Sequence, residues 1–196
     1  PAGVALCESC RSSLPPSEHA ACRCCGARTP ELPGDAESCP HCREHRLRFD
    51  RTLCYGDYEG LLRELILQMK ADATQQIATA LGNLLAEQFR QQLGAIGADA
   101  VVPIPMHSWR KLARPSNPAD RLAEVVAGSL GVPLLRKLLR WDNSTAAQLG
   151  LSQPGRFRNM RGAMAVTPGY TLDGPTLVVV DDVMTTGATC SEAARV

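Results

Sequence analysis

The stretch that most constrains this chain runs from Leu177 to Thr189 and reads LVVVDDVMTTGAT. Val178, Val179 and Val180 are β-branched residues without polar alternation, which predicts a central parallel strand buried on both faces. Two acids end the run, and a hydroxyl-rich loop with one glycine precedes helix-forming residues. The order of strand, loop and helix start is typical of an α/β fold, and it leaves backbone N–H groups available to an anion.

The acids are Asp181 and Asp182, and the loop residues are Thr185, Thr186, Gly187, Ala188 and Thr189. Adjacent carboxylates accept hydrogen bonds from vicinal ribose hydroxyls, while threonine hydroxyls and loop amides suit a 5′-phosphate. The element resembles, at every position, the phosphoribosyl diphosphate (PRPP) binding motif of type I phosphoribosyltransferases. The plainer alternatives are a turn in which Asp182 or a threonine caps the helix, and an acid pair that binds Mg²⁺.

Seven of the nine cysteines lie in the first fifty residues. Cysteine pairs two residues apart on tight turns are typical of zinc knuckles, whose loop amides hydrogen-bond the sulfurs. Cys22 and Cys25 with Cys39 and Cys42 form a complete four-cysteine set, and we predict a structural zinc site there. A disulfide framework is the alternative. The prolines and glycines between the pairs preclude a packed core, so metal is expected to fold this segment.

Cys7 and Cys10 form a further pair without an obvious partner pair. We expect them to be metal ligands as well. A second site would be completed either by cysteines upstream of Pro1, or by His19 or Cys24.

The rest of the chain predicts a parallel α/β sheet flanked by helices. Arg48 to Tyr58 is expected to form a strand or hairpin, and an amphipathic pattern from Leu61 to Phe89 falters near Lys70, which favours two helices. Asp99 to Pro105 predicts a second strand. Asn117 with Pro118 predicts a helix N-cap and first turn, and the segment 132–139 is expected to be a short strand or helix with basic flanks.

Positive charge is concentrated between His107 and Arg161. This segment holds ten Lys or Arg residues, listed here, against Asp120, Glu124 and Asp142: Arg110, Lys111, Arg114, Arg121, Arg136, Lys137, Arg140, Arg156, Arg158 and Arg161. A surface with this excess suits phosphates of a nucleotide or of nucleic acid, although a solvated basic face is the plainer interpretation.

No apolar run reaches the roughly 18 residues that span a bilayer, and no charged-then-apolar leader opens the chain. We therefore expect a cytoplasmic protein without a membrane span. We expect two domains: a zinc ribbon over 1–47, truncated at its start, and an α/β domain over 48–196, truncated at its end.

A second informative stretch lies between Thr145 and Gly162, where polar residues and arginines follow no single helical face. Its pattern is T-x-x-Q-x-x-L followed by R-x-x-N-x-x-G-A, built from Thr145, Gln148, Leu151, Arg156, Asn159 and Gly162. Together with the cysteine pairs, the YEG sequence at Tyr58, the VPIPMH sequence before Ser108 and the acid-threonine element, this order resembles the competence protein F (ComF/ComFC) family.

The resemblance implies an N-terminal double zinc ribbon and a type I phosphoribosyltransferase fold. It further implies that Asp181, Asp182 and Thr185–Thr189 bind PRPP with Mg²⁺, and that the protein handles incoming single-stranded DNA with other competence proteins. The chain departs from the family in one loop, where Arg114-Pro-Ser-Asn-Pro118 replaces Arg-Gly-Phe-Asn-Gln.

We therefore expect a competence-associated, phosphoribosyltransferase-like protein that displaces pyrophosphate from PRPP if it is catalytic. Lys70, Arg110 or Lys111 would neutralise the leaving group, and no residue stands out as a base. The alternatives are a non-catalytic nucleic-acid-binding adaptor with a vestigial PRPP pocket, and a purine-salvage phosphoribosyltransferase.

Overall fold

The computed structural model describes residues 6–14, 21–29, 39–107, 116–142 and 153–196. Two parallel strands lie at its centre, β1 (Ala100–Pro103) and β4 (Leu177–Val180), with Val101 opposite Val178. A parallel bridge between Val101 and Leu134 continues this sheet on the other edge of β1. The expected parallel α/β sheet is therefore confirmed.

A second pair of strands is antiparallel and consists of β2 (Leu139–Trp141) and β3 (Met164–Val166). The segment 132–139 thus contributes one bridge at Leu134, while its regular strand begins only at Leu139. Buried Leu138 and Met164 pack with Val102 of β1, which joins the two sheets into one core.

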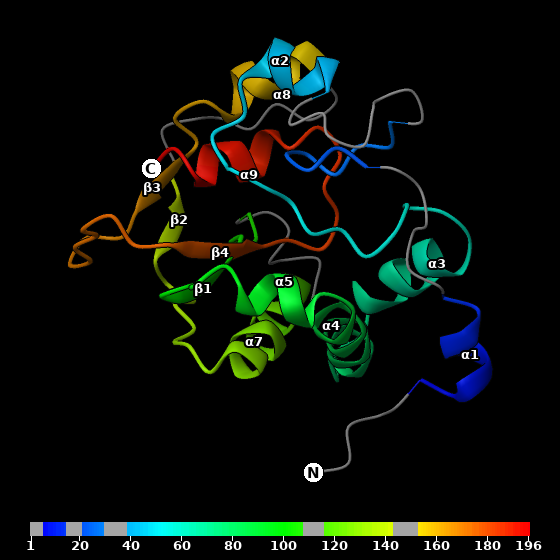
Figure 1. The fold of residues 1–196 in the computed structure, drawn as a ribbon. Helices are drawn as coiled ribbons and strands as arrows, with labels where there is room; N and C mark the ends of the chain where they lie inside the picture. The colour runs from blue at the N-terminus through cyan, green and yellow to red at the C-terminus, as the bar shows by residue number, and fades with distance from the viewer. Residues whose placement is uncertain (1–5, 15–20, 30–38, 108–115, 143–152) are drawn as a thin grey trace.

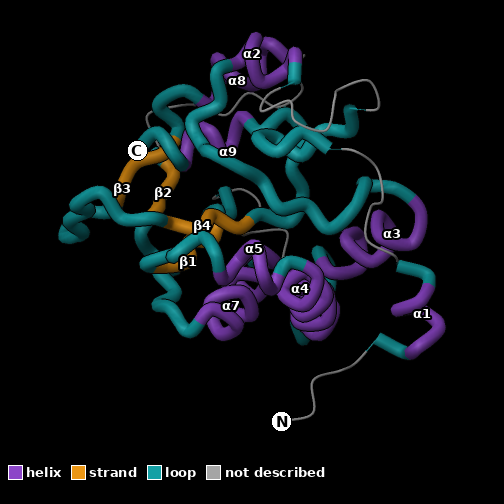
Figure 2. Tube along the Cα trace, viewed as in Figure 1, coloured by secondary structure: helices purple, strands orange, loops and turns teal. Residues whose placement is uncertain are grey.

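Helices cover both sides of the parallel sheet (Figure 1). One side carries α4 (Gln76–Gln88), α5 (Arg90–Gly94) and α7 (Pro118–Leu130). The opposite side carries α9 (Ala188–Ala193), with α2 (Pro40–His45) and α8 (Gln153–Met160) beyond it. Figure 2 shows the strands between these two groups of helices.

The predicted break in the first amphipathic pattern is confirmed. Helix α3 (Gly60–Met69) ends before Lys70, and α4 starts after Gln75, whose φ of 58° is left-handed. Between them, the carboxylate of Asp72 accepts hydrogen bonds from the backbone N–H groups of Thr74 at 2.8 Å and Ile77 at 3.1 Å. The second bond satisfies an N–H group in the first turn of α4 that has no partner within the helix, and the first one closes the turn before it.

Helix α7 begins as the sequence predicts, with Asn117 at the N-cap and Pro118 in the first turn. The Asn117 amide does not cap the helix; it donates to the carbonyl of Ile104 at 3.0 Å and to Asp120 Oδ1 at 3.1 Å. The helix is thereby fastened to the segment that follows β1.

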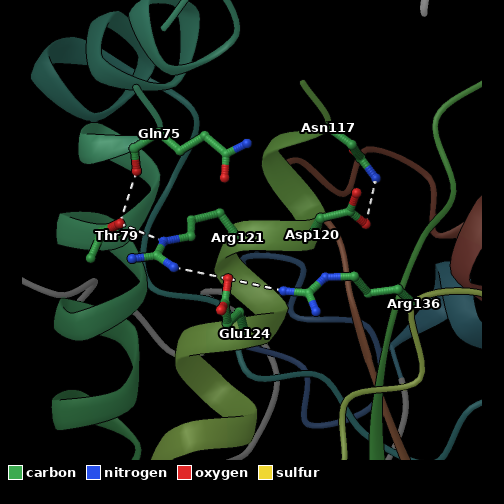
Figure 3. Close-up of polar contacts among 7 residues, drawn as sticks. All are labelled: Gln75, Thr79, Asn117, Asp120, Arg121, Glu124 and Arg136. Carbon is green, nitrogen blue, oxygen red and sulfur yellow. Dashed lines mark hydrogen bonds and ion pairs between the residues drawn. The ribbon is translucent and has the colours of Figure 1, made fainter. Parts of the chain in front are cut away.

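The packing of α4 on α7 is close because Gly82 faces Val125, where an added Cβ would lie 3.0 Å from the Val125 Cβ. A polar network borders this contact (Figure 3). Arg121 donates to Thr79 Oγ1 at 2.8 Å and to Glu124 at 2.8 Å, and Arg136 pairs with the same Glu124 oxygen at 3.0 Å. One acid therefore holds two cations of the basic segment.

Two expectations for strands are wrong. Arg48 to Tyr58 forms no regular strand, because its described hydrogen bonds go elsewhere: Thr52 N–H donates to the carbonyl of Arg23, and Arg48 N–H to Ser191 Oγ. Strand β4 is half-buried along its length and not fully buried. Within the described ranges it pairs only with β1, so one of its edges lacks the strand that full burial requires.

Candidate functional site

The predicted four-cysteine set comes together as one cluster. Cys22 and Cys25 lie on a turn closed by a bridge between Ala21 and Arg28, while Cys39 and Cys42 flank the first turn of α2. All four side chains are buried. We call the residues 21–28 and 39–47 the cysteine ribbon.

The cluster has dimensions that fit a metal ion. The four sulfurs lie within 4.8 Å of one another, with separations of 3.7 Å for Cys22 and Cys42 and 3.5 Å for Cys25 and Cys39. A tetrahedral zinc with Zn–S bonds of about 2.3 Å places its sulfurs about 3.8 Å apart. The thiols are thus spaced for a structural zinc ion with little movement.

The thiols of this cluster differ in acidity. Burial opposes ionisation of Cys22, but backbone N–H groups of Cys25, Cys39 and Cys24 hold its pKa down at about 7. Burial raises the pKa of the Cys25 thiol to about 12. Amides directed at a sulfur are the expected knuckle geometry, and they favour the thiolate that binds metal.

Cys7 and Cys10 lie away from this cluster, with Cys7 at the N-cap of helix α1 (Glu8–Ser12) and Cys10 within it. This helix is attached to α4 by an ion pair between Arg11 and Glu87. Within the described part of the chain, no set of three or more ligand side chains forms around Cys7 and Cys10. His19 lies outside the described residues, and Cys24 Sγ faces the carbonyl of Phe49.

The two acids lie at the carboxyl end of β4. Here β4 runs beside the end of β1, and Ile104 N–H donates to the carbonyl of Val180 at 2.8 Å. Asp182 forms an ion pair with Lys70, with 3.1 Å between Nζ and Oδ2. Lys70 follows α3, so the helix break that the sequence predicts brings a cation to the acid pair. We call Asp181, Asp182 and the loop 185–189 the carboxylate edge.

Asp181 is in a different environment from Asp182. Its carboxylate accepts a hydrogen bond from the N–H of Asp182 at 2.9 Å. Burial, and next the neighbouring charge of Asp182, raise the pKa of Asp181 to about 7. A proton on this group near neutral pH would turn it from an acceptor into a donor toward a ligand.

The loop after the acids makes a tight turn. Gly187 has a φ of 75° and occupies the N-cap of α9, a left-handed conformation that favours glycine. Thr186 is 4% exposed, and its Oγ1 accepts the N–H of Ala188 at 3.4 Å. Thr185 is exposed and Thr189 is half-buried. The side chain of Thr186 is thus used within the turn, while Thr185 lies at its surface.

An aromatic ring adjoins this edge. The Tyr58 side chain is 42% exposed. Its ring lies 6.0 Å from Lys70 Nζ and 5.8 Å from the guanidinium of Arg63, distances at which cations are attracted to the face of an aromatic ring. The ring therefore borders the cation that pairs with Asp182.

The second informative stretch is attached to the helix that follows the loop. Gly162 N–H donates to Glu192 Oε1 at 2.6 Å, and Arg195 donates to both oxygens of Glu192 at 2.8 Å. Thr145, Gln148 and Leu151 lie outside the described residues, as do Arg110, Lys111 and Arg114. Asn159 is half-buried on α8.

Three residues of this region escaped the sequence analysis. His41 donates to the carbonyl of Thr186, Phe49 packs against Gly187, and buried Glu192 holds Gly162. The position of His41 between Cys39 and Cys42 was the one available signal. The other two contacts join positions far apart in the chain, and no local pattern predicts them.

A cavity of about 850 Å³ lies apart from the carboxylate edge, between α4 and α7. It is lined by residues such as Asn83, Arg90 and Arg121. In the portion of the chain that is described, no helix combines the length and apolar character needed to cross a bilayer.

Comparisons with known proteins find several curated relatives of the chain. The chain is 32% identical to DNA utilization protein YhgH of Salmonella typhimurium over 179 residues, which cover 89% of this chain and 76% of that protein. It is 28% identical to competence protein F of Haemophilus influenzae over 97% of this chain and 82% of that protein, and 26% identical to competence protein ComFC of Bacillus subtilis over 97% and 76%.

No family model matches the chain, and no solved structure matches it significantly. The relatives are nevertheless similar over most of their own length, between 76% and 82% for these three proteins. With 32% identity across 89% of its residues, the chain belongs to the competence protein F family, which includes the DNA utilization proteins.

Proposed function

We propose that the carboxylate edge binds the phosphoribosyl group of PRPP. The observation that supports this most strongly is the position of the acid pair and threonine loop, at the carboxyl end of a strand that runs parallel to its neighbour. Open α/β sheets bind their ligands at that edge. Asp181 and Asp182 would accept hydrogen bonds from ribose hydroxyls, and the loop with exposed Thr185 would meet the 5′-phosphate.

Lys70 supplies the charge that a diphosphate requires. Its ammonium has three N–H donors, of which one suffices for Asp182. The remaining donors would be available to a diphosphate oxygen beside the acid pair, which charge-assisted hydrogen bonds would stabilise. Mg²⁺ bound with the diphosphate would neutralise further charge.

The reaction that this arrangement supports is displacement at C1 of the ribose. The bond from C1 to the diphosphate oxygen breaks, a nitrogen nucleophile bonds to C1 and loses a proton, and pyrophosphate departs. Positive charge develops on the ribose in such a transition state. The carboxylates would hold the ring and stabilise that charge, and Lys70 would stabilise the departing pyrophosphate.

Calorimetric titration with PRPP and Mg²⁺ tests this proposal. Substituting both Asp181→Ala and Asp182→Ala should weaken binding at least about a hundredfold, because two charged acceptors are lost. Asp173→Ala removes an exposed acid elsewhere and should leave the affinity unchanged. Unaltered binding by the double variant would assign PRPP to another site.

A second activity, contact with single-stranded DNA, is supported by the remaining basic residues. Lys137, Arg140, Arg158 and Arg161 are exposed and take part in none of the ion pairs between described residues. The names of the relatives refer to competence and DNA utilization. We propose that these side chains contact phosphates, in a protein that acts as an adaptor or that couples this contact to PRPP binding.

Fluorescence anisotropy with oligothymidine across a salt series tests the second activity. The logarithm of affinity should fall steeply with the logarithm of salt, by about 0.7 for each phosphate contact. Arg158→Ala with Arg161→Ala should reduce that slope, whereas Arg136→Ala, whose charge Glu124 already holds, should change it less. Affinity that does not depend on salt would exclude the adaptor and favour a purine-salvage transferase.

A further inference from the structure

The cysteine ribbon contacts the threonine loop directly, through a histidine that lies between two cysteines of the cluster. His41 lies between Cys39 and Cys42, and its Nε2 is 2.9 Å from the carbonyl oxygen of Thr186. A carbonyl oxygen only accepts, so Nε2 must carry the hydrogen. The contact joins residues 145 positions apart in the sequence.

The polypeptide that leaves the ribbon forms a second contact with the same turn. A Cβ added to Gly187 would lie 3.4 Å from Phe49 Cζ and 3.7 Å from Leu47 Cδ1. Arg48 N–H, between these two residues, donates to Ser191 Oγ on α9 at 3.1 Å. The turn is thus held by one hydrogen bond from the ribbon, by apolar packing and by a backbone bond.

Helix α2 also contacts α8. The His45 ring stacks on the Phe157 ring with centroids 4.3 Å apart and planes 12° apart, and the His41 ring lies edge-on to His45 at 4.7 Å. Figure 1 shows α2 beside α8, with α9 next to them. The short helix is therefore placed between the loop and the segment that carries Asn159.

Helix α2 depends on its cysteines for order. It has six residues, far fewer than the roughly 12 that a helix needs to persist alone in water. Metal ligation would fix Cys39 before its first residue and Cys42 on its first turn, and thereby the backbone that carries His41. Loss of the metal would release this turn, and the bond to Thr186 with it.

We propose that metal in the cysteine ribbon sets the conformation of the threonine loop, with His41 as the positioning residue. The ribbon would then form part of the wall of the ligand site, and loss of the metal would loosen the loop. The coupling between metal and loop does not depend on which ligand the loop takes. Its effect on PRPP affinity rests on the proposed function.

Hydrogen exchange of the zinc-loaded full chain tests the coupling. His41→Ala should raise the exchange rate of amides in 186–191 by roughly threefold to tenfold, the factor that corresponds to one lost hydrogen bond. Ser191 N–H, which donates to the carbonyl of Gly187 at 2.8 Å, is the most informative amide. His41→Gln keeps an N–H donor of similar reach and should restore part of the protection.

Arg43→Ala is the matched control, because Arg43 is exposed on the same helix. It should leave exchange in 186–191 unchanged. Zinc content must equal that of the original protein in all three variants, so that any difference is due to the histidine. Unchanged exchange in His41→Ala with zinc retained, or an equal rise in Arg43→Ala, would overturn the proposal.

The coupling must also act in the opposite direction, because linkage between two sites is reciprocal. Gly187→Ala would push the turn against Phe49 and should weaken zinc binding by roughly twofold to tenfold, as measured by equilibrium competition with a chromogenic chelator. Gly128→Ala is its control, since an added Cβ there meets nothing within 4 Å. Equal zinc affinities for Gly187→Ala and the original protein would contradict the coupling.

Titration with PRPP separates this inference from the proposed function. If the original protein does not bind PRPP, the proposed function fails while the exchange and zinc-affinity results still decide the coupling. If PRPP binds and His41→Ala weakens it without changing exchange in 186–191, the coupling fails and the PRPP site stands.

Discussion

The core of the cysteine ribbon is made of four buried sulfurs, whereas the core between α4 and α7 is made of aliphatic side chains. The ribbon core consists of Cys22, Cys25, Cys39 and Cys42, with Leu47 and Cys24 beside it. The helices α3, α4, α5 and α7, which we call the helical layer, instead bury residues such as Ala123, Val126 and Leu93 against the sheet. We therefore expect the ribbon to need a metal ion to form its interior, whereas the helical layer buries apolar surface of its own.

The carboxylate edge lies between these two regions and depends on both. Lys70 reaches Asp182 from the helical layer, and His41 reaches Thr186 from the ribbon. Substitutions in the cysteine ribbon and in the helical layer should therefore differ in their effect on stability. Both should disturb the contacts of the carboxylate edge.

Cys39→Ser should have the largest effect, because structural zinc contributes on the order of 10 kcal/mol to the order of a small metal domain. We expect zinc content to fall to background, and limited proteolysis to cut within 21–47 while α4 and α7 resist. Cys54→Ser, which replaces an exposed cysteine outside the cluster, should retain its zinc. Proteolysis spreading through α4 and α7 would show that the two regions are not independent.

Met69→Ala should act on the helical layer and cost about 2–4 kcal/mol, the usual range for truncating a buried methionine. Met69 is 2% exposed and packs with Leu65, Ile66 and Leu81. Urea unfolding should show the loss, with the zinc content unchanged. Leu67→Ala, at an exposed position of the same helix, should cost far less. A loss of zinc together with the loss of stability would show that the cysteine ribbon and the helical layer do not unfold independently.

Asp181→Asn should stabilise the protein by roughly 1–3 kcal/mol at alkaline pH. The pKa of Asp181 rises on folding from its usual 3.8 to about 7. The stability gained from the protonated acid is fully present below the pKa of the unfolded state, 3.8, and is lost as pH rises through the pKa of the folded state, about 7. The advantage of Asn should thus grow between about pH 4 and pH 7, the interval between the two pKa values, and level off above it, as thermal unfolding in Mg²⁺-free buffer would measure.

The exposed Asp50→Asn variant is the control for this measurement and should show no such growth. A constant or shrinking advantage of Asp181→Asn over the same pH range would mean that Asp181 ionises freely. The same substitution should weaken PRPP binding, because a charged acceptor for ribose is removed.

Arg136→Ala should have the smallest effect, about 0.5 kcal/mol or less, because its ion pair with Glu124 is exposed. Arg121 still occupies Glu124 in this variant. Denaturation at low and high salt would check this, with the small difference disappearing at high salt. A loss of stability above about 1 kcal/mol would mean that the network of Figure 3 stabilises the fold more than exposed ion pairs usually do.

Local sequence rules predict the elements whose cause is local. The break before Gln75, the N-cap at Asn117 and the knuckle pairs follow from short patterns, and all three are present. The expectation for Arg48 to Tyr58 failed because its backbone bonds to Arg23 and Ser191, at positions no local pattern reveals. The burial of β4 was overestimated because burial depends on neighbouring strands and not on the apolar run itself.

The candidate site divides in the same way. Asp181, Asp182 and the threonines follow from one continuous stretch, while the contact of His41 with Thr186 joins distant segments and requires coordinates. The charge of the basic segment is also only partly visible in the sequence, since Glu124 binds both Arg121 and Arg136.

Lys70 is the C-cap residue of α3, just before the turn that joins α3 to α4, and the direction of its side chain depends on how α3 is rotated about its axis. Leu65, Ile66 and Met69 anchor one face of α3 in the core, and the ammonium reaches Asp182 only at the rotation this face dictates. Each inserted residue advances a helix by about 100°, so one extra residue before Lys70 would turn the cation away from the acid. An insertion or deletion after Thr74 leaves the rotation of Lys70 about the α3 axis unchanged. Natural insertions and deletions in the family should therefore be more frequent after Thr74 than within α3.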